Sequence, residues 1–289
     1  MVELLQLKYF CDAAETENFS QTAKKYNVPV SNISQTIQRL EKELGTELFY
    51  HMSNRITLNE KGHIFYNCAK KALTSIEDGR RMLSDFEDKI AGEIKVLVLT
   101  NRRVVTKAIE NFKREYPEVS FVIKHNTGEN DDFDLIIADE YFPDKSFEMS
   151  VLLGEKILLA VQKGSLLSQK ERINIEELKK ERFITMPEGS SMYTITNRLC
   201  SGFIPNIAIQ SDDPYYIRKY VSMGLGIAFV PSMSWRGQFS ENVVLKDVGN
   251  IMRNTVIARK KGKYLSKQTA IFIEMLKKAA DKSKYNDLG

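Results

Sequence analysis

The sequence predicts an N-terminal all-α domain, a long helix and a C-terminal α/β domain, and three observations support this order. Short helical patterns with one apolar stripe fill residues 4–45. From Phe65 to Ile90 an apolar or small residue recurs at alternating steps of four and three. From residue 94 onward, apolar runs alternate with helical patterns. We expect the boundaries at residues 1–62, 63–91 and 92–289.

Composition excludes several classes of protein. The chain has 289 residues, a net charge of +4, three cysteines and three histidines, with no spacing typical of a disulfide framework or a zinc site. No run approaches the ~20 apolar residues of a membrane-spanning helix. We therefore expect a soluble cytoplasmic protein that needs no metal or other cofactor. Residues 1–65 hold seven basic and eight acidic side chains, so charge alone does not indicate nucleic-acid binding.

The spacing of apolar residues and the residues typical of helix ends predict the first three helices. Apolar residues at three-to-four spacing predict a helix from Leu4 to Ala14. Ser20 is expected to be the N-cap of a short helix that Asn27 ends. A third helix should run from Pro29 to Gly45, with Pro at its start where the missing N–H costs little. Its apolar stripe is Ile33, Ile37, Leu40 and Leu44.

Polar residues occupy the other face of this third helix, near its beginning. Two short helices joined by a tight turn, the second polar outward, are typical of a helix-turn-helix motif whose polar face enters a major groove. Asn and Gln can pair with adenine, Arg with guanine, and Ser with either. The alternative is a three-helix bundle with a solvated face. The candidate DNA-reading residues are Asn32, Ser34, Gln35, Gln38 and Arg39.

Residues 47–62 predict a wing after the third helix. A short strand, a turn at Ser53 and Asn54, and a second strand from Arg55 to Leu58 would form it.

The long helix carries a heptad seam. A single helix of this length has no core of its own, so its seam should bury against a second copy of the chain. The alternative is an amphipathic helix lying on the C-terminal domain of the same chain. The expected seam consists of Phe65, Ala69, Ala72, Ile76, Leu83 and Phe86, with Gly79 and Ile90 in the same register.

The C-terminal part alternates strands and helices, which predicts a mostly parallel sheet in two subdomains with a cleft between them. Polar residues where strands end and helices begin are candidate ligand contacts, because free amides there bind anions. Simple helix capping is the open alternative. Two interpretations of Arg102 and Arg103 are equally supported: they attract an anionic effector such as a small carboxylate, or they are simply a solvated pair. The candidates are Thr100, Asn101, Thr127, Ser190 and Ser191, and residues 277–289 are expected to be frayed.

The chain resembles the LysR-type transcriptional regulators. The matching N-terminal residues include Leu7, Phe10, Phe19, Ala23, Val28, Ser34, Ile37, Leu40, Glu41, Leu44, Gly45, Leu48, Phe49, Leu58 and Gly62. The C-terminal matches include Phe112, Tyr116, Pro117, the runs 134–137, 176–178 and 202–205, and the run 221–228 with Pro231. The chain departs from the usual residues of the family at three positions: it has Val30 where the family has Gln, His51 where the family has Arg, and Asn59 where the family has Thr.

The resemblance implies a winged helix-turn-helix, a dimerising linker helix and a periplasmic-binding-protein-like effector domain. It adds Ser31 and Arg55 to the DNA-binding candidates and Phe203 to the effector-binding candidates. It implies a dyad site on double-stranded DNA, a small-molecule effector and a homodimer or homotetramer. Between Gly128 and Asp134 too few residues remain for the helix that the family places there, so the first subdomain should be trimmed.

The sequence thus predicts a bacterial-type, effector-modulated transcriptional regulator rather than an enzyme. An alternative is a cytoplasmic small-molecule-binding protein that uses its N-terminal helices only for assembly. An enzyme is disfavoured because no nucleophile elbow, metal spacing or phosphate loop occurs. Cys200 is expected to be a free structural thiol.

Overall fold

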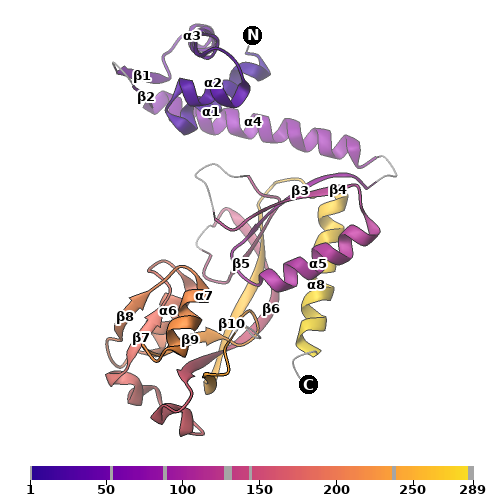
Figure 1. Cartoon of the computed structure of the whole chain (residues 1–289). Helices are drawn as coiled ribbons and strands as arrows, with labels where there is room; N and C mark the ends of the chain where they lie inside the picture. Colours follow the sequence, from indigo (N-terminus) through magenta and orange to yellow (C-terminus); the bar gives the residue numbers. More distant parts are fainter. Residues whose placement is uncertain are drawn as a thin grey trace. The chain divides into compact units, whose positions relative to one another are not determined.

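The computed structural model describes residues 2–52, 55–86, 90–126, 132–142, 145–235 and 239–285. The chain forms two compact units (Figure 1). One consists of residues 1–90 with the short segments 127–132 and 262–267, and the other contains the rest.

The N-terminal unit has the predicted helices and wing. Strands β1 and β2 pair antiparallel, with Phe49 opposite Leu58, and the predicted turn at Ser53 and Asn54 lies outside the described residues. The elements are α1 (Leu4–Thr16), α2 (Phe19–Tyr26), α3 (Val30–Leu44), β1 (Phe49–Met52), β2 (Arg55–Leu58) and α4 (Glu60–Ser84).

One hydrophobic core holds these elements together. Ile33, Ile37 and Leu40 of α3 are fully buried, and Leu44 packs at the edge of the same cluster. The rings of Phe10 and Phe49 meet edge to face at 5.6 Å, which joins α1 to the wing. The predicted stripe therefore anchors α3 to the helices and strands around it.

The predicted N-cap of α2 is wrong. Asn18, two residues before Ser20, is extended, and its side-chain oxygen accepts hydrogen bonds from the amides of Ser20 at 2.9 Å and Gln21 at 3.1 Å. The helix therefore begins at Phe19. Asn and Ser can both act as N-caps, but the N-cap is the residue directly before the first helical residue. Asn18 occupies that position, so its side chain accepts from the free amides of the first turn.

Helix α4 is shorter than predicted. Asn59 caps its start by accepting from the amide of Gly62, so this residue performs the capping role that Thr can also perform. The helix ends at Ser84, where the amide of Phe86 bonds the carbonyl of Leu83 at 3.2 Å in a tighter turn. Phe86 thus follows the helix instead of continuing it, and residues 87–89 lie outside the described part.

The C-terminal unit contains a six-stranded sheet in the order β4-β3-β5-β10-β6-β9. Strands β3, β4 and β5 run parallel, but β10 pairs antiparallel with β5 and β6, and β9 pairs antiparallel with β6. The prediction of a mostly parallel sheet is therefore wrong. The six strands are β3 (Gly92–Val98), β4 (Val119–Lys124), β5 (Leu135–Asp139), β6 (Phe147–Gln162), β9 (Ala228–Pro231) and β10 (Val243–Lys260).

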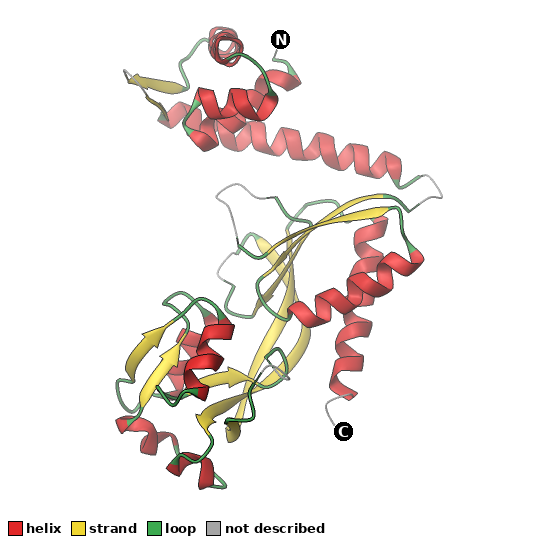
Figure 2. Ribbon diagram, in the orientation of Figure 1, coloured by secondary structure: helices red, strands yellow, loops and turns green. Residues whose placement is uncertain are grey.

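The long strands β6 and β10 give this unit two lobes. Figure 2 shows them running from the part that contains β3, β4 and β5 to the part that contains β7, β8 and β9. Strands β7 and β8 form a separate parallel pair, linked to the large sheet by a bridge between Phe183 and Ile227. The second lobe also contains η1 (Leu166–Gln169), η2 (Ile175–Lys180), β7 (Arg182–Thr185), α6 (Ser191–Leu199), β8 (Asn206–Gln210) and α7 (Pro214–Ser222).

Helices α5 (Arg102–Glu115) and α8 (Lys267–Tyr285) cover the first lobe. Phe112 of α5, Phe121 of β4 and Phe272 of α8 pack together, with ring centroids between 4.9 and 5.6 Å apart. The expected frayed tail is wrong as far as Tyr285, because α8 continues through it and buries Ala279 and Ala280.

Candidate functional site

The start of α3 exposes polar side chains while its opposite face is buried. Ser31, Asn32, Gln35, Gln38 and Arg39 are exposed, and Ser34 is partly exposed. The α3 core residues Ile33, Ile37 and Leu40 are 0%, 1% and 0% exposed. Val30, in place of a hydrogen-bonding side chain, is also exposed and adds an apolar contact at the same end. This surface offers the groups that hydrogen-bond base edges and phosphates.

Two carboxylates, one of them buried, fix the wing beside α3. Glu41 of α3 accepts hydrogen bonds from the amides of Leu48 at 2.7 Å and Phe49 at 3.3 Å, where β1 begins. Glu17 accepts from the amide of Leu58 in β2 at 3.2 Å. Both wing strands are thus tied to the helices. Arg55 begins β2, and its side chain lies outside the described part.

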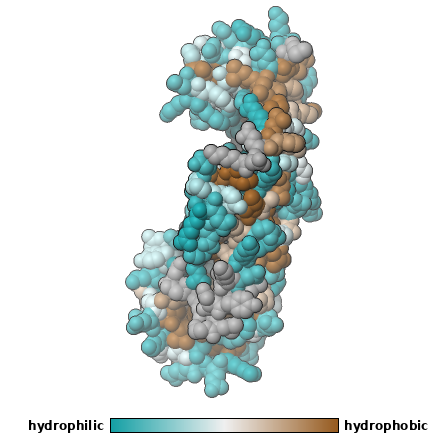
Figure 3. Space-filling view, turned by 90° about the vertical axis from the view of Figure 1, so that its right-hand side faces the viewer, coloured by the Kyte–Doolittle hydropathy of each residue, from teal (hydrophilic) through white to brown (hydrophobic). Residues whose placement is uncertain are grey.

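The predicted seam of α4 divides into two sections. Ala69 is buried and Phe65 is partly buried against the N-terminal core of the same chain, so these two members of the predicted seam pack within the chain and not against a second copy. Ala72, Ile76, Leu83 and Phe86 are exposed, Leu83 by 71% and Phe86 by 87%. Hydrophobic residues are visible at the surface of this unit in Figure 3.

A polar cluster holds the first half of α4 on α1. The Glu15 carboxylate accepts from the Tyr66 hydroxyl at 2.8 Å and forms an ion pair with Lys70. Burial, and then the hydrogen bond to Glu15, raise the pKa of Tyr66 to about 12. The first half of α4 is therefore held in a fixed direction relative to α1.

Thr100 and Asn101 lie beside a buried network that the sequence analysis did not identify. Thr100 follows β3, and Asn101 occupies the N-cap position of α5 in the left-handed conformation. The Asn101 amide donates to the Thr255 hydroxyl at 2.5 Å, and the Arg253 guanidinium donates to the Thr100 hydroxyl at 3.1 Å. These contacts join the start of α5 to strand β10.

The centre of this network is an ion pair between Arg253 and Glu155. Arg253 is 3% exposed and Glu155 1% exposed, with 2.7 Å between Nη2 and Oε1. Oε2 of Glu155 accepts the amides of Met233 at 2.9 Å and Ser234 at 2.8 Å, and Oε1 also accepts the Ser234 hydroxyl at 3.0 Å. The carboxylate is therefore fully satisfied, as a buried charge requires.

The register of β6 and β10 creates this pair. Arg253 and Glu155 are directly opposed in the antiparallel ladder, between two register shifts. Their separation by 98 residues hides the pairing from a reading of local patterns. Neither residue lies in a strand that the sequence pattern predicts, so local patterns gave no signal for the pair.

The other effector candidates lie elsewhere in the C-terminal unit. Ser190 caps α6 by accepting from the Tyr193 amide at 3.2 Å, and Ser191 is the first helical residue. Phe203 packs near Phe183 in the second-lobe core, with centroids 6.5 Å apart. Thr127 lies outside the described residues. The network thus includes Thr100 and Asn101 but not Ser190, Ser191 or Phe203, and Arg102 and Arg103 are exposed on α5.

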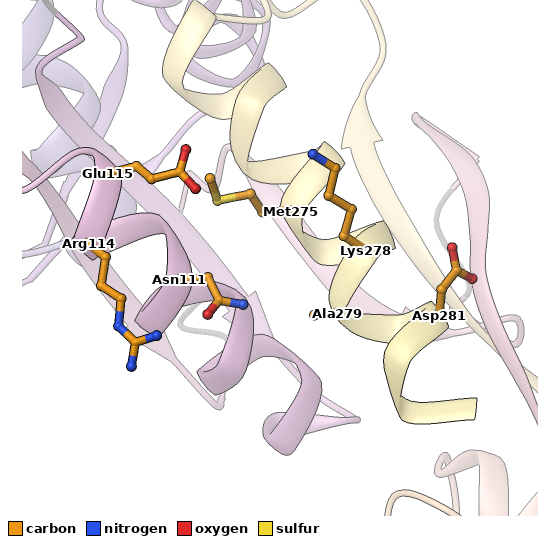
Figure 4. A pocket seen from close by; sticks show the side chains of 7 residues that line it. All are labelled: Asn111, Arg114, Glu115, Met275, Lys278, Ala279 and Asp281. Atoms are coloured by element: carbon orange, nitrogen blue, oxygen red, sulfur yellow. The ribbon is translucent and has the colours of Figure 1, made fainter. Parts of the chain in front are cut away.

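A separate groove of about 510 Å³ lies between α5 and α8 (Figure 4). Asn111, Arg114 and Glu115 line one side, and residues of α8 including Met275 and Lys278 line the other. Its lining combines both signs of charge and an apolar floor, and it shares no residue with the network around Arg253.

The thiols and acidic groups give no metal site in the part of the chain that the structure describes. Cys11 and Cys200 are buried, Cys68 is exposed, and all three are free. Across the described ranges, no cluster of three or more His, Cys, Asp or Glu side chains could hold a metal ion. Within the same residues, each helix is too short or too polar to cross a membrane.

Two family models match the chain. Residues 4–63 match the bacterial regulatory helix-turn-helix protein of the lysR family, and residues 88–281 match the LysR substrate binding domain. The first match contains α3 and the wing, and the second contains Thr100, Glu155 and Arg253.

Relatives and solved structures extend the similarity over nearly the whole chain. The transcriptional dual regulator GltC of Bacillus subtilis is 27% identical and covers 81% of this chain and 82% of its own. The HTH-type transcriptional regulator AlsR of the same species is 26% identical, covering 90% and 91%. Full-length OxyR from Pseudomonas aeruginosa superposes with a TM-score of 0.72 at 20% identity, covering 97% and 95%. Full-length CbnR complexed with its target DNA superposes with a TM-score of 0.63 at 19% identity, covering 96% of this chain and 100% of its own. OxyR and CbnR therefore share the fold of this chain.

Proposed function

The chain belongs to the LysR family of bacterial transcriptional regulators, and from that membership we propose how its residues read DNA, assemble and bind an effector. It is a DNA-binding regulator with an N-terminal helix-turn-helix domain and a C-terminal effector-binding domain. The residues that perform each task are the subject of the proposal.

The exposed start of α3 enters the major groove, and this is the observation on which the DNA-binding proposal depends. Its polar side chains project from a helix whose other face is fully buried, so their positions are set by the core and not by the DNA. Gln35 and Asn32 would read base edges, while Arg39 and the wing residue Arg55 would contact the phosphate backbone. Ser31, Ser34 and Gln38 complete the surface.

A second copy of the chain pairs through the exposed section of α4. Its polar face remains in water, while Ala72, Ile76 and Leu83, together with Phe86 two residues beyond the helix, would be buried between the two chains. Two linked DNA-binding domains gain affinity for an inverted repeat, because the second contact becomes intramolecular. The dimer is the unit that reads DNA, and two dimers can assemble into a tetramer.

An effector binds in the C-terminal unit, with Thr100 and Asn101 at the start of α5 as contacts. Ser190, Ser191, Phe203 and Thr127 remain proposed contacts from the second lobe and the adjoining loop. Ligand binding would favour one placement of the two lobes and so one arrangement of the paired DNA-binding domains. Such coupling is typically worth about 1–3 kcal/mol.

We infer a regulatory role rather than a catalytic one, and a cytoplasmic location, because the relatives are transcriptional regulators. The rival role, a small-molecule-binding protein whose N-terminal helices serve only assembly, predicts no selection among DNA sequences.

Selection of bound duplexes from a random library by the full-length protein tests the proposal. At fixed salt, because phosphate contacts make affinity salt-dependent, we expect enrichment of an inverted repeat. Ser34→Ala with Gln35→Ala should reduce affinity for that repeat towards the level of random DNA while the melting temperature stays unchanged.

Gln210→Ala is the matched control, since Gln210 is an exposed glutamine in β8 of the other unit. It should leave the selected repeat and the affinity unaltered. An absence of enrichment at every salt concentration, or unchanged selectivity in the α3 variant, would favour the assembly-only role.

A further inference from the structure

Strand β6 has a free edge in the first lobe. Among the residues that the structure describes, β10 is the only strand paired with Phe147–Val151, because β9 joins β6 only from Ile157 to Ala160. In an antiparallel pair, alternate residues point their N–H and C=O groups away from the partner strand. Within the described ranges, no other backbone hydrogen bond reaches Phe147–Val151. This edge can therefore accept one more strand.

The burial of β6 shows where the edge is open. Four successive residues, 148–151, are exposed, and among them Met149 is 47% and Val151 is 63% exposed. The next two residues are buried, and a register shift against β10 ends the regular ladder there. The open part is thus the five-residue stretch Phe147–Val151, and Met149 is its midpoint.

One face of this stretch is apolar. Residues that are directly opposed in an antiparallel ladder share a face of the sheet. Met149 is opposite Ala258 and Val151 is opposite Val256, and both of these β10 residues belong to the first-lobe core against which Phe147 packs. Met149 and Val151 therefore extend the core face of the sheet to its edge, where water covers them.

The single charge of the stretch already has a partner. Glu148 lies on the opposite face and forms an ion pair with Arg259 of β10 at 3.2 Å. Proteins commonly protect a sheet edge with lysine, proline or a short strand. The stretch contains no lysine and no proline. Apart from the register shift that limits its length, it lacks the features that prevent pairing.

The stretch is complementary to itself in the antiparallel direction. A two-fold axis at Met149 places Met149 opposite its own copy and Phe147 opposite Val151 of the second copy. The pairs on the core face are then all apolar. On the other face, the Ser150 hydroxyl lies opposite Glu148 of the second copy and can donate to its carboxylate, so no like charges are directly opposed. A second copy of this chain therefore fits the edge as an isologous partner.

A single contact of this kind is weak. Five residues a side are far fewer than the roughly 20–30 of a stable interface. A dimer carries two such edges, and two dimers that meet through both gain affinity because the second contact is intramolecular. Isolated chains should therefore stay unpaired, and the edge should act only between dimers.

We propose that β6 is the contact through which two α4-joined dimers assemble: Phe147–Val151 of one copy pairs antiparallel with the same stretch of another, and two six-stranded sheets become one. The proposal rests on the α4 dimer proposed above. It adds the surface, the register and the residues of the second contact.

The mass of the full-length protein as a function of concentration tests the contact. In analytical ultracentrifugation, the parent should change from dimer to tetramer as the concentration rises. Met149→Lys places two lysines opposite each other at the axis, so the concentration at which half the protein is tetrameric should rise roughly tenfold or more. Met252→Lys, the same change at an exposed methionine of β10, is the control and should behave as the parent. Both variants should keep the parent's melting temperature.

Cysteine cross-linking tests the register. Directly opposed Cα atoms of an antiparallel pair are about 4.5–5.5 Å apart, which a disulfide can span. The background is Cys68→Ser, which removes the exposed native thiol. In it, Met149→Cys should give a disulfide-linked pair of chains under mild oxidation. Val151→Cys is also exposed but lies opposite Phe147 of the second copy, so it should stay unlinked.

The proposal is overturned if the parent never exceeds the mass of a dimer, if Met149→Lys forms tetramers as readily as the parent, or if Val151→Cys links as fast as Met149→Cys. If Met149→Lys does not fold, the cross-linking pair decides. A failure of the α4 contact has a different signature, because Leu83→Glu would then keep the mass of the parent, and the Met149→Cys cross-link would still decide the edge.

Discussion

Arg253 and Glu155 are directly opposed across the β10–β6 ladder, and their side chains form a 2.7 Å ion pair that is almost fully buried. The pair contacts Thr100 after β3 on one side and Ser234 after β9 on the other. It therefore connects the two lobes where the long strands pass between them.

The first prediction concerns the stability of this pair. Arg253→Met should destabilise the protein by about 3–5 kcal/mol, because it leaves the Glu155 carboxylate buried without a counter-charge. Glu155→Leu with Arg253→Met should recover most of that loss, since well-packed apolar residues can replace a buried pair. Chemical denaturation of the two variants measures both values. A single variant as stable as the parent would show that the pair is not buried in solution.

The second prediction concerns Glu41 and the wing. Glu41→Ala removes the acceptor of the Leu48 and Phe49 amides, so we expect a loss of about 1–3 kcal/mol and weaker operator binding. Glu47→Ala changes an exposed glutamate nearby and serves as the control. Denaturation and DNA titration measure the two effects. Equal behaviour of both variants would contradict the role of Glu41.

The third prediction concerns assembly. Leu83→Glu or Phe86→Glu should produce monomers, because each places a carboxylate in the proposed α4 contact. Asn67→Glu adds the same charge to an exposed position of α4 on the opposite heptad face and should leave the assembly intact. Light scattering of the full-length variants gives the masses. A mass unchanged from that of the parent in the Leu83 and Phe86 variants would place the dimer contact elsewhere.

The fourth prediction concerns the thiols. Burial raises the pKa of Cys11 to about 12 and of Cys200 to about 11, above the usual 9.0, so both remain protonated near pH 8. Iodoacetamide reacts with thiolate and should modify only exposed Cys68 in the native protein, and all three after denaturation. Because the folded pKa is raised, these groups reduce stability as the pH rises from 9 through 11. Rapid native modification of Cys200 at pH 8, seen by mass spectrometry, would contradict its burial.

The N-terminal unit was largely predictable because its signals are local. The stripe Ile33, Ile37 and Leu40 has helical spacing, and Gly45 ends the helix with a positive φ of 67°. Where two polar residues stood close together, as Asn18 and Ser20 do, the sequence did not show which received the free amides. Which of the two residues is the N-cap depends on where the backbone enters the helical conformation, and this start differs by less than one turn between the two alternatives.

The C-terminal unit was harder to predict because its decisive contacts are distant in sequence. Strand β10 is interrupted by polar residues such as Lys246, Asp247 and Asn250, so it lacks the continuous apolar run of a buried strand. Helix α8 has its apolar residues at helical spacing, from Phe272 to Ala280, but the following lysines suggested fraying. The Arg253–Glu155 contact depends on strand register, which neither segment determines alone.

The double passage of β6 and β10 has a consequence for dissecting the molecule. One 16-residue and one 18-residue strand each belong to both lobes, so the first lobe consists of two separate chain segments and the second lobe is the piece of chain between them. No single cut in the gene can release an intact lobe, and melting one end of the ladder withdraws hydrogen-bond partners from the other. The effector-binding domain should therefore unfold as one cooperative unit, with a single heat-absorption peak in calorimetry.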